Sequence, residues 1–307
     1  MPDALEAAQQ LGNSAKHAGI PEATLAMVTL AAYDDPVSGQ PGARAQSNSS
    51  GASSVRAALV LFGVILLVLT VGFLAKVPWA TTLWPWPAAP LSYVFIASIL
   101  SAIAIPVLWI AASGEIAAAQ AGSIDLVVMY GGMLVYVVTL LGDPGQPELW
   151  PYVIVFGVAC AGSAGFFAWS RKIAWRDQRP MPSLLRSSFA AFALILTAAG
   201  TALIFHSAIF PWRLTSEASV MFGLVYLGAA VYFIHGFLRP RWANAAGQLA
   251  GFLAYDLVLM APFLSHFKVV GGGQLASLII YTVFVVYSGA LGIYYLFLHD
   301  KTRINIS

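Results

Sequence analysis

Long apolar runs, separated by short polar segments, fill the chain from residue 56 onward. Eight such runs recur, at 56–76, 91–113, 123–141, 151–170, 184–207, 217–238, 243–264 and 275–298. A helix of about 20 apolar residues crosses the roughly 30 Å hydrocarbon core of a bilayer, and it satisfies its own backbone hydrogen bonds there. The pattern therefore predicts an all-α fold, a polytopic membrane bundle of about eight transmembrane helices.

The composition excludes an ordinary soluble domain. The 307 residues are 59% hydrophobic and 9% charged, whereas soluble domains carry about 25% charged residues. The net charge of +2 is too small for a general attraction to nucleic acid. We therefore expect the lipid bilayer as the surrounding medium and no nucleic-acid partner.

Lysine and arginine are distributed unevenly between the two ends of the predicted spans, and cytoplasmic loops are enriched in these residues. If the N-terminus is inside, only Lys76, Arg213 and Lys268 fall outside. The rest of the 15 then fall inside: Lys16, Arg44, Arg56, Arg171, Lys172, Arg176, Arg179, Arg186, Arg239, Arg241, Lys301 and Arg303. This distribution predicts both termini in the cytoplasm, in a plasma or inner membrane.

The segment before the first apolar run is different in kind. Residues 1–55 combine short apolar stretches with a Ser-, Gly- and Pro-rich sequence, and this composition is typical of a flexible tail. Residues 21–33 could form one short helix, which would be marginal in isolation. We therefore expect a flexible cytoplasmic tail, and a second short tail at 299–307.

The transmembrane part contains an internal similarity at an offset of about 127 residues. LVLT at 67–70 matches LILT at 194–197, Pro85–Trp86 matches Pro211–Trp212, and AGSAGFF at 161–167 matches SGALGIY at 288–294. Each copy holds four spans, so both copies enter the membrane in the same direction and form parallel repeats. This predicts repeats at 56–170 and 184–298, a basic cytoplasmic linker at 171–183 and a groove between the halves.

Small residues recur at intervals of four in the last span of each predicted repeat. They are Gly157, Ala161 and Gly165 in the first repeat, and Ser288 and Gly292 in the second. Such faces let helix backbones approach closely in lipid. They favour helix packing, with a ligand channel as the alternative. We also expect a protein partner or an oligomer contact through these faces and the N-terminal tail.

A polar stripe in the seventh span is the strongest candidate site. Asn244, Gln248 and Tyr255 lie on roughly one side of the predicted helix, with Asp256 at its edge near mid-membrane. A carboxylate at that depth is costly unless it has a partner. Both a ligand or proton role and a structural hydrogen-bond network between helices remain open for this stripe.

The other acidic and basic candidates have simpler explanations. Glu115 and Asp125 flank a short inner turn, where helix ends and water are expected to solvate them. Histidines near span ends could in principle clamp a haem, but none has a counterpart in the other repeat: His206, His235, His266 and His299.

Motifs for catalysis and metal binding are absent from the sequence. It contains no HExxH, Walker or GxSxG motif, and the single cysteine, Cys160, rules out an intrachain disulfide. We therefore expect no catalytic residues, no cofactor and no metal, and hence a protein that is not an enzyme.

Two functional hypotheses follow. The first is a non-catalytic accessory or scaffold subunit of a larger membrane complex. The second is a small-molecule transporter or carrier with a site between the two repeats near Asp256. The sequence favours the first, because buried polar groups are few and the predicted tail could fold on a partner.

Overall fold

The computed structural model describes residues 48–142 and 147–303. Most of the predicted N-terminal tail, with its possible helix at 21–33, lies outside the described residues, as does the end of the C-terminal tail. Gly51–Ser307 forms one compact unit, and the account below concerns this unit by itself.

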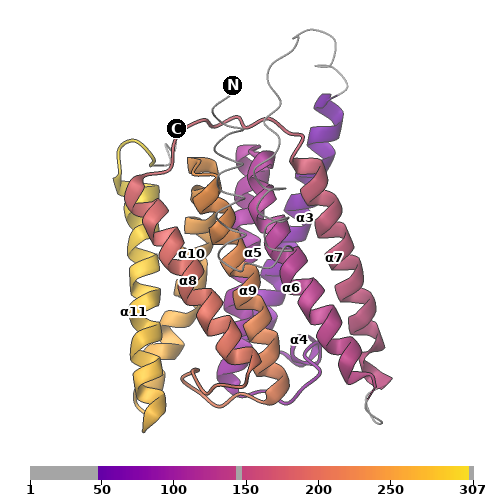
Figure 1. Ribbon diagram of the computed structural model, residues 1–307, viewed down its shortest axis with the longest axis vertical. Helices are drawn as coiled ribbons and strands as arrows, with labels where there is room; N and C mark the ends of the chain where they lie inside the picture. Colours follow the sequence, from indigo (N-terminus) through magenta and orange to yellow (C-terminus); the bar gives the residue numbers. More distant parts are fainter. Residues whose placement is uncertain (1–47, 143–146, 304–307) are drawn as a thin grey trace, which may run out of the picture. The chain divides into compact units, whose positions relative to one another are not determined.

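Eight helices of the described chain are long and apolar enough to cross a membrane. In chain order the long helices are α3 (Asn48–Leu74), α5 (Pro90–Ser113), α6 (Ala119–Leu140), α7 (Trp150–Ser170), α8 (Ser183–Ile204), α9 (Ser216–Leu238), α10 (Trp242–His266) and α11 (Gly273–Ile293) (Figure 1). Shorter helical pieces are α4 (Pro78–Thr81), 3-10 turns at Ile116–Ala118 and Pro147–Leu149, and a π-turn at Tyr294–Leu298. The predicted all-α, multi-pass membrane fold is confirmed.

Helix ends follow local chemistry. Pro90 opens α5, where its missing N–H costs nothing because the first helical N–H groups have no partner in the helix. Gly114 ends the same helix at φ 70°, a left-handed conformation that favours glycine. Thr215 caps α9, because its side chain accepts a hydrogen bond from the Ala218 N–H at 3.2 Å.

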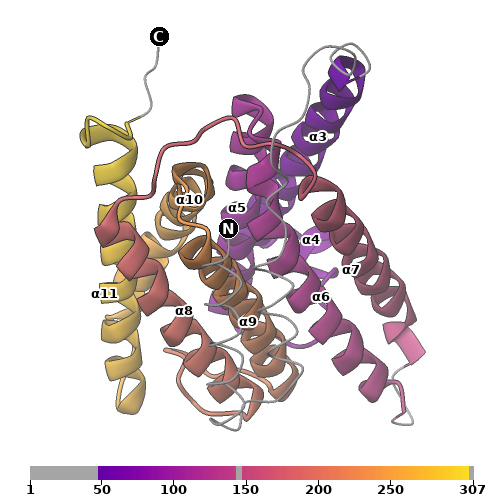
Figure 2. The same ribbon diagram turned by 45° about the horizontal axis from the view of Figure 1, so that its top comes forward.

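The helix contacts cross between the two predicted repeats. α5 packs against α10 and α6 packs against α9, while α7, α8 and α11 pack on α6, α9 and α10. Figure 2 shows α6 beside α9 and α8 in front of α9. A two-fold rotation that exchanged α5 with α9 and α6 with α10 would interchange the two crossing pairs. The central pairs fit parallel repeats, but the first helices do not match, because α8 packs closely on α9 whereas α3 makes few contacts with α5. The duplication stays a prediction.

Glycines set the closest helix approaches. A Cβ on Gly223 would lie 2.7 Å from the Gly200 carbonyl oxygen, so α8 and α9 can meet there only without side chains. A Cβ on Gly251 would likewise lie 2.7 Å from the Ala102 carbonyl oxygen, between α10 and α5. At these contacts the backbones of α8 and α9, and those of α5 and α10, approach each other directly.

The linker between the predicted repeats is fastened to both of them. The Glu115 carboxylate is buried and accepts hydrogen bonds from the backbone N–H groups of Arg176 and Asp177, at 3.0 and 2.8 Å. On the other side, the Trp242 N–H donates to the Arg179 carbonyl at 2.8 Å. The expectation that water and helix ends solvate Glu115 is therefore wrong, because the linker covers this residue and supplies its donors.

Candidate functional site

Two cavities flank the central helices α5, α6, α9 and α10. The narrow cavity, about 110 Å³, is bordered by α9 and α10 with α8 and α11 beside them. The wide cavity, about 330 Å³, is bordered by α5 and α6 with α3 and α7 beside them. Four residues line both cavities: Ala102, Ile103, Asp125 and Gln248. Two of these four residues, Asp125 and Gln248, are polar, so polar side chains lie where the two cavities meet.

Asp125 lies well inside the membrane-spanning part of α6. The preceding turn at Ile116–Ala118 continues into α6, which places Asp125 about 13 Å along the helix axis from Ile116. Residues of the same span, not an exposed helix end, surround it, so the expectation that this carboxylate is solvated at the inner turn is wrong. The reason is that the span begins seven residues earlier than residue 123, the start expected from hydropathy.

The Asp125 carboxylate has no hydrogen bond or ion pair within the described part of the chain. Gly228 of α9 makes room for it, because any side chain at that position would collide with the carboxylate. Burying an unpaired charged group in an apolar interior costs several kcal/mol of free energy. The charged form of this side chain therefore requires a partner that the described residues do not supply, and without such a partner the carboxyl group is neutral.

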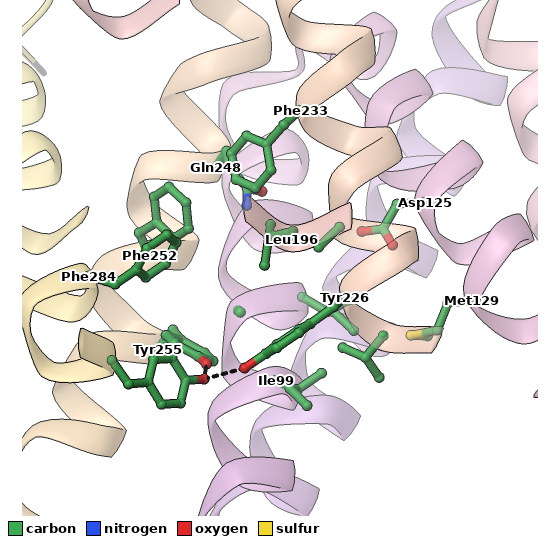
Figure 3. Close-up of a pocket in the computed structure, with 15 residues that line it drawn as sticks. Ile99, Asp125, Met129, Leu196, Tyr226, Phe233, Gln248, Phe252, Tyr255 and Phe284 are labelled. Atoms are coloured by element: carbon green, nitrogen blue, oxygen red, sulfur yellow. Dashed lines mark hydrogen bonds between the residues drawn. The ribbon is translucent and has the colours of Figure 1, made fainter. Parts of the chain in front are cut away.

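Gln248 faces the same space from α10. Figure 3 shows Asp125 and Gln248 on different helices around the narrow cavity, with Leu196 between them in the view. Like Asp125, the Gln248 amide makes no hydrogen bond to other described residues. Two polar side chains without protein partners thus meet one shared cavity wall.

Three tyrosine hydroxyls form a chain at another part of the narrow cavity. The Tyr226 hydroxyl donates to Tyr281 at 2.8 Å, and Tyr281 also shares a hydrogen bond with Tyr255 (Figure 3). Three hydroxyls carry three hydrogens, and these two bonds use two of them. One hydroxyl hydrogen remains available, so this part of the wall offers a donor while Asp125 offers acceptors.

Asp256, the leading candidate from sequence, is in a different environment. Its side chain is 5% exposed and is not among the residues that line these two cavities. The Ser288 hydroxyl of α11 lies 3.1 Å from both carboxylate oxygens. Asp256 therefore lies in the dry contact between α10 and α11, the geometry expected for helix adhesion rather than for a ligand role.

The remaining two predicted residues also separate. Tyr255 lines the narrow cavity, whereas Asn244 is fully buried near the start of α10. The Asn244 side-chain amide nitrogen donates to the Arg239 carbonyl at 2.8 Å, and the Tyr232 hydroxyl donates to the backbone carbonyl of Asn244 at 2.9 Å. The structure therefore brings Tyr255 and Gln248 to a cavity and leaves Asn244 and Asp256 in helix contacts.

The two small-residue faces differ in the same way. In α11, Ser288 is fully buried, and a Cβ on Gly292 would lie 2.8 Å from the side chain of Leu253 in α10. In α7, Ala161 is exposed and a Cβ on Gly165 would meet nothing within 4 Å. Gly157 is at the edge of contact, since its Cβ would lie 4.0 Å from Leu134. Only the α11 face is packed within the described chain.

Two histidines make local contacts, whereas the buried Nδ1 atom of His235 has no hydrogen-bond partner among the described residues. The His266 ring lies 3.1 Å from the Pro211 carbonyl oxygen, and the His299 ring lies 2.9 Å from the Thr302 hydroxyl. Among the described residues, no group of three or more His, Cys, Asp or Glu side chains is placed to hold a metal ion. The polar groups that line the two cavities are one carboxylate, one amide and the hydroxyls of serine and tyrosine, and the remaining walls are apolar.

Comparison with known proteins does not extend this account. No family model, no curated protein and no solved structure matches the chain.

Proposed function

We propose that this multi-pass membrane protein is a non-catalytic carrier that binds a small, mostly apolar molecule between its two halves. The observation that supports it is the pair Asp125 and Gln248, which have no partners among the described residues where the two cavities meet. Accessory function alone gives no reason to keep an unpaired carboxylate at this depth, because its burial lowers stability.

The position of the pair supports transport in particular. Asp125 belongs to the crossing pair α6–α9, and Gln248 belongs to the crossing pair α5–α10. A ligand held by both residues would bridge the two helix pairs. Because Asp125 lies in the first half and Gln248 in the second, rocking of one half against the other would alter access to the ligand, as in carriers built from repeated halves.

Transport can be tested without knowing the substrate. The full-length protein is reconstituted in liposomes, and uptake is followed for three labelled probes that cross lipid slowly: benzyltrimethylammonium, phenylalanine and 2-phenylethanesulfonate. We expect at least one probe to enter faster than into protein-free liposomes, and Asp125→Asn to remove that excess. If all three probes enter native and empty liposomes at equal rates, the carrier proposal fails.

An accessory or scaffold role is the second candidate, and the outer surface of α7 favours it. Within this helix only Ser170 is buried in the described chain, and the glycine face at Gly165 is open. Purification in a mild detergent would show whether a protein of fixed stoichiometry co-elutes. The variant Cys160→Ser/Gly165→Cys, whose single cysteine lies on this face, would show by crosslinking whether a second copy binds there.

A further inference from the structure

We infer that the wide cavity binds an organic ammonium ion, with the positive charge at Asp125 and the apolar body along the cavity wall. This inference rests on the proposed function and specifies the chemical class of its ligand.

No positively charged side chain of the described residues forms an ion pair with Asp125. Two arginines near these helices have other contacts: Arg56 of α3 donates to the Ala111 carbonyl at 2.7 Å, and Arg239 at the end of α9 donates to the Gln120 amide oxygen at 3.4 Å. Neither forms an ion pair with Asp125. An ammonium ligand would supply the charge and N–H donors that the described residues lack.

The wall of the wide cavity is mainly apolar and aromatic. Besides Asp125 and Gln248, the wide cavity is lined mostly by apolar and aromatic side chains, including Tyr130, Phe166 and Tyr232. Aromatic ring faces attract organic cations, whereas a bare metal cation requires about six oxygen ligands. The Ser123 hydroxyl already donates to the Ala119 carbonyl at 2.8 Å. The wall therefore suits a cation that brings its own hydrocarbon surface.

The wide cavity is bordered by residues that are exposed on the outside of the helix bundle. Phe62 of α3 and Gly162 of α7 line the wide cavity and are exposed on the helix surface. A cavity bordered by exposed residues of two spanning helices can be reached from the lipid side. An amine with an apolar body partitions into the bilayer and would enter along this route.

Three probes with one phenylbutyl body and different charges test the inference: 4-phenylbutylamine, 4-phenylbutanol and 4-phenylbutyrate. Equilibrium binding to the full-length protein in lipid nanodiscs is measured at neutral pH. We expect the amine to bind at least 10-fold more tightly than the alcohol, and the acid to bind most weakly. In Asp125→Asn the preference for the amine should fall to within about 2-fold, whereas Asp256→Asn should retain it.

A size-exclusion profile identifies any variant that fails to fold, and Gly122→Leu is a second, uncharged probe of the same site. A Cβ on Gly122 would have its nearest neighbour at 3.9 Å, so a larger side chain fits into the cavity without a backbone clash. This variant should weaken the binding of all three probes by a similar factor.

Equal binding of amine and alcohol to the native protein, or an amine preference that survives Asp125→Asn, would overturn the inference. Uptake of phenylalanine without amine binding would refute it and leave the carrier proposal standing.

Discussion

The third and fourth helices of the two halves, α6–α7 and α10–α11, carry the same kinds of residue in different surroundings. Asp256 in α10 is bonded to Ser288 in a dry helix contact, while Asp125 in α6 faces a cavity without a partner among the described residues. The glycine face of α11 packs on α10, while the matching face of α7 is open. Residue type alone therefore does not separate a structural position from a candidate binding position.

The tryptophans of the repeated Pro–Trp pair show the same contrast. The Trp212 indole N–H donates to the Ser92 hydroxyl at 3.0 Å and so connects the two halves. Trp86, its predicted equivalent, is also buried, but its indole N–H has no partner among the described residues. Identical side chains at matching positions therefore contribute differently to stability.

The largest effect is expected from Gly292→Leu. The added side chain would meet Leu253 and, through its Cβ at 3.2 Å, the Leu249 carbonyl oxygen, so α10 and α11 would have to separate. We expect a loss of about 1–3 kcal/mol in the free energy of unfolding, measured by detergent denaturation. Gly165→Leu is the matched control and should change it by less than about 0.5 kcal/mol. Equal losses would remove the distinction between the two faces.

The next largest difference is expected between substitutions of Asp256 and of Asp125, in their effect on the free energy of unfolding. Asp256→Leu removes the contact with the Ser288 hydroxyl and should cost about 1–2 kcal/mol of unfolding free energy, whereas Asp256→Asn, which can still accept that hydrogen bond, should be nearly silent. Asp125→Leu should not destabilise the protein, because it removes an unpaired polar group. Thermal unfolding in detergent measures all three variants, and a strongly destabilised Asp125→Leu would show that Asp125 has a structural role.

A smaller difference is expected between the tryptophans. Trp212→Phe loses the hydrogen bond to Ser92 and should lower the free energy of unfolding by about 1 kcal/mol. Trp86→Phe should be neutral or slightly stabilising, because its buried N–H has no described partner. The two variants are compared by the same denaturation measurement. A larger loss at Trp86 would contradict the asymmetry.

The smallest effect concerns the linker, outside the membrane. The Arg179 guanidinium donates hydrogen bonds to the Asp177 carboxylate and lowers the pKa of Asp177 below its ordinary value of 3.8. The stabilisation is therefore present above that value and disappears as the pH falls through the lowered pKa. Because Arg179 is half exposed, Arg179→Gln should cost under about 0.5 kcal/mol near neutral pH. The cost should fall at strongly acidic pH to the part that comes from the Arg179 contacts with the Lys301 carbonyl and the Trp242 ring, and a cost that grew on acidification would exclude this ion pair as its source.

The sequence by itself determined the class of fold and the approximate limits of the spans. About 20 consecutive apolar residues can satisfy their backbone in lipid only as a helix, so eight such runs leave little choice. The starts and ends were predicted to within a few residues, with two exceptions. Helix α3 begins at Asn48, eight residues before the predicted start of the first span, and the third span begins at Ile116, seven residues before its predicted start. The second error followed from the mixed sequence of residues 115–125, and it concealed Asp125.

Only the tertiary structure decided which polar residues share a cavity. Helical periodicity places Gln248, Tyr255 and Asp256 around one helix, but it does not say which neighbouring helix lies on each side. In soluble proteins an apolar stripe marks the core. In a membrane, lipid and protein interior are similarly apolar, so the sequence carries little record of which side faces inward. The packing of α6 on α9 and of α10 on α5 and α11 therefore placed Asp125 at a cavity and Asp256 in a dry contact.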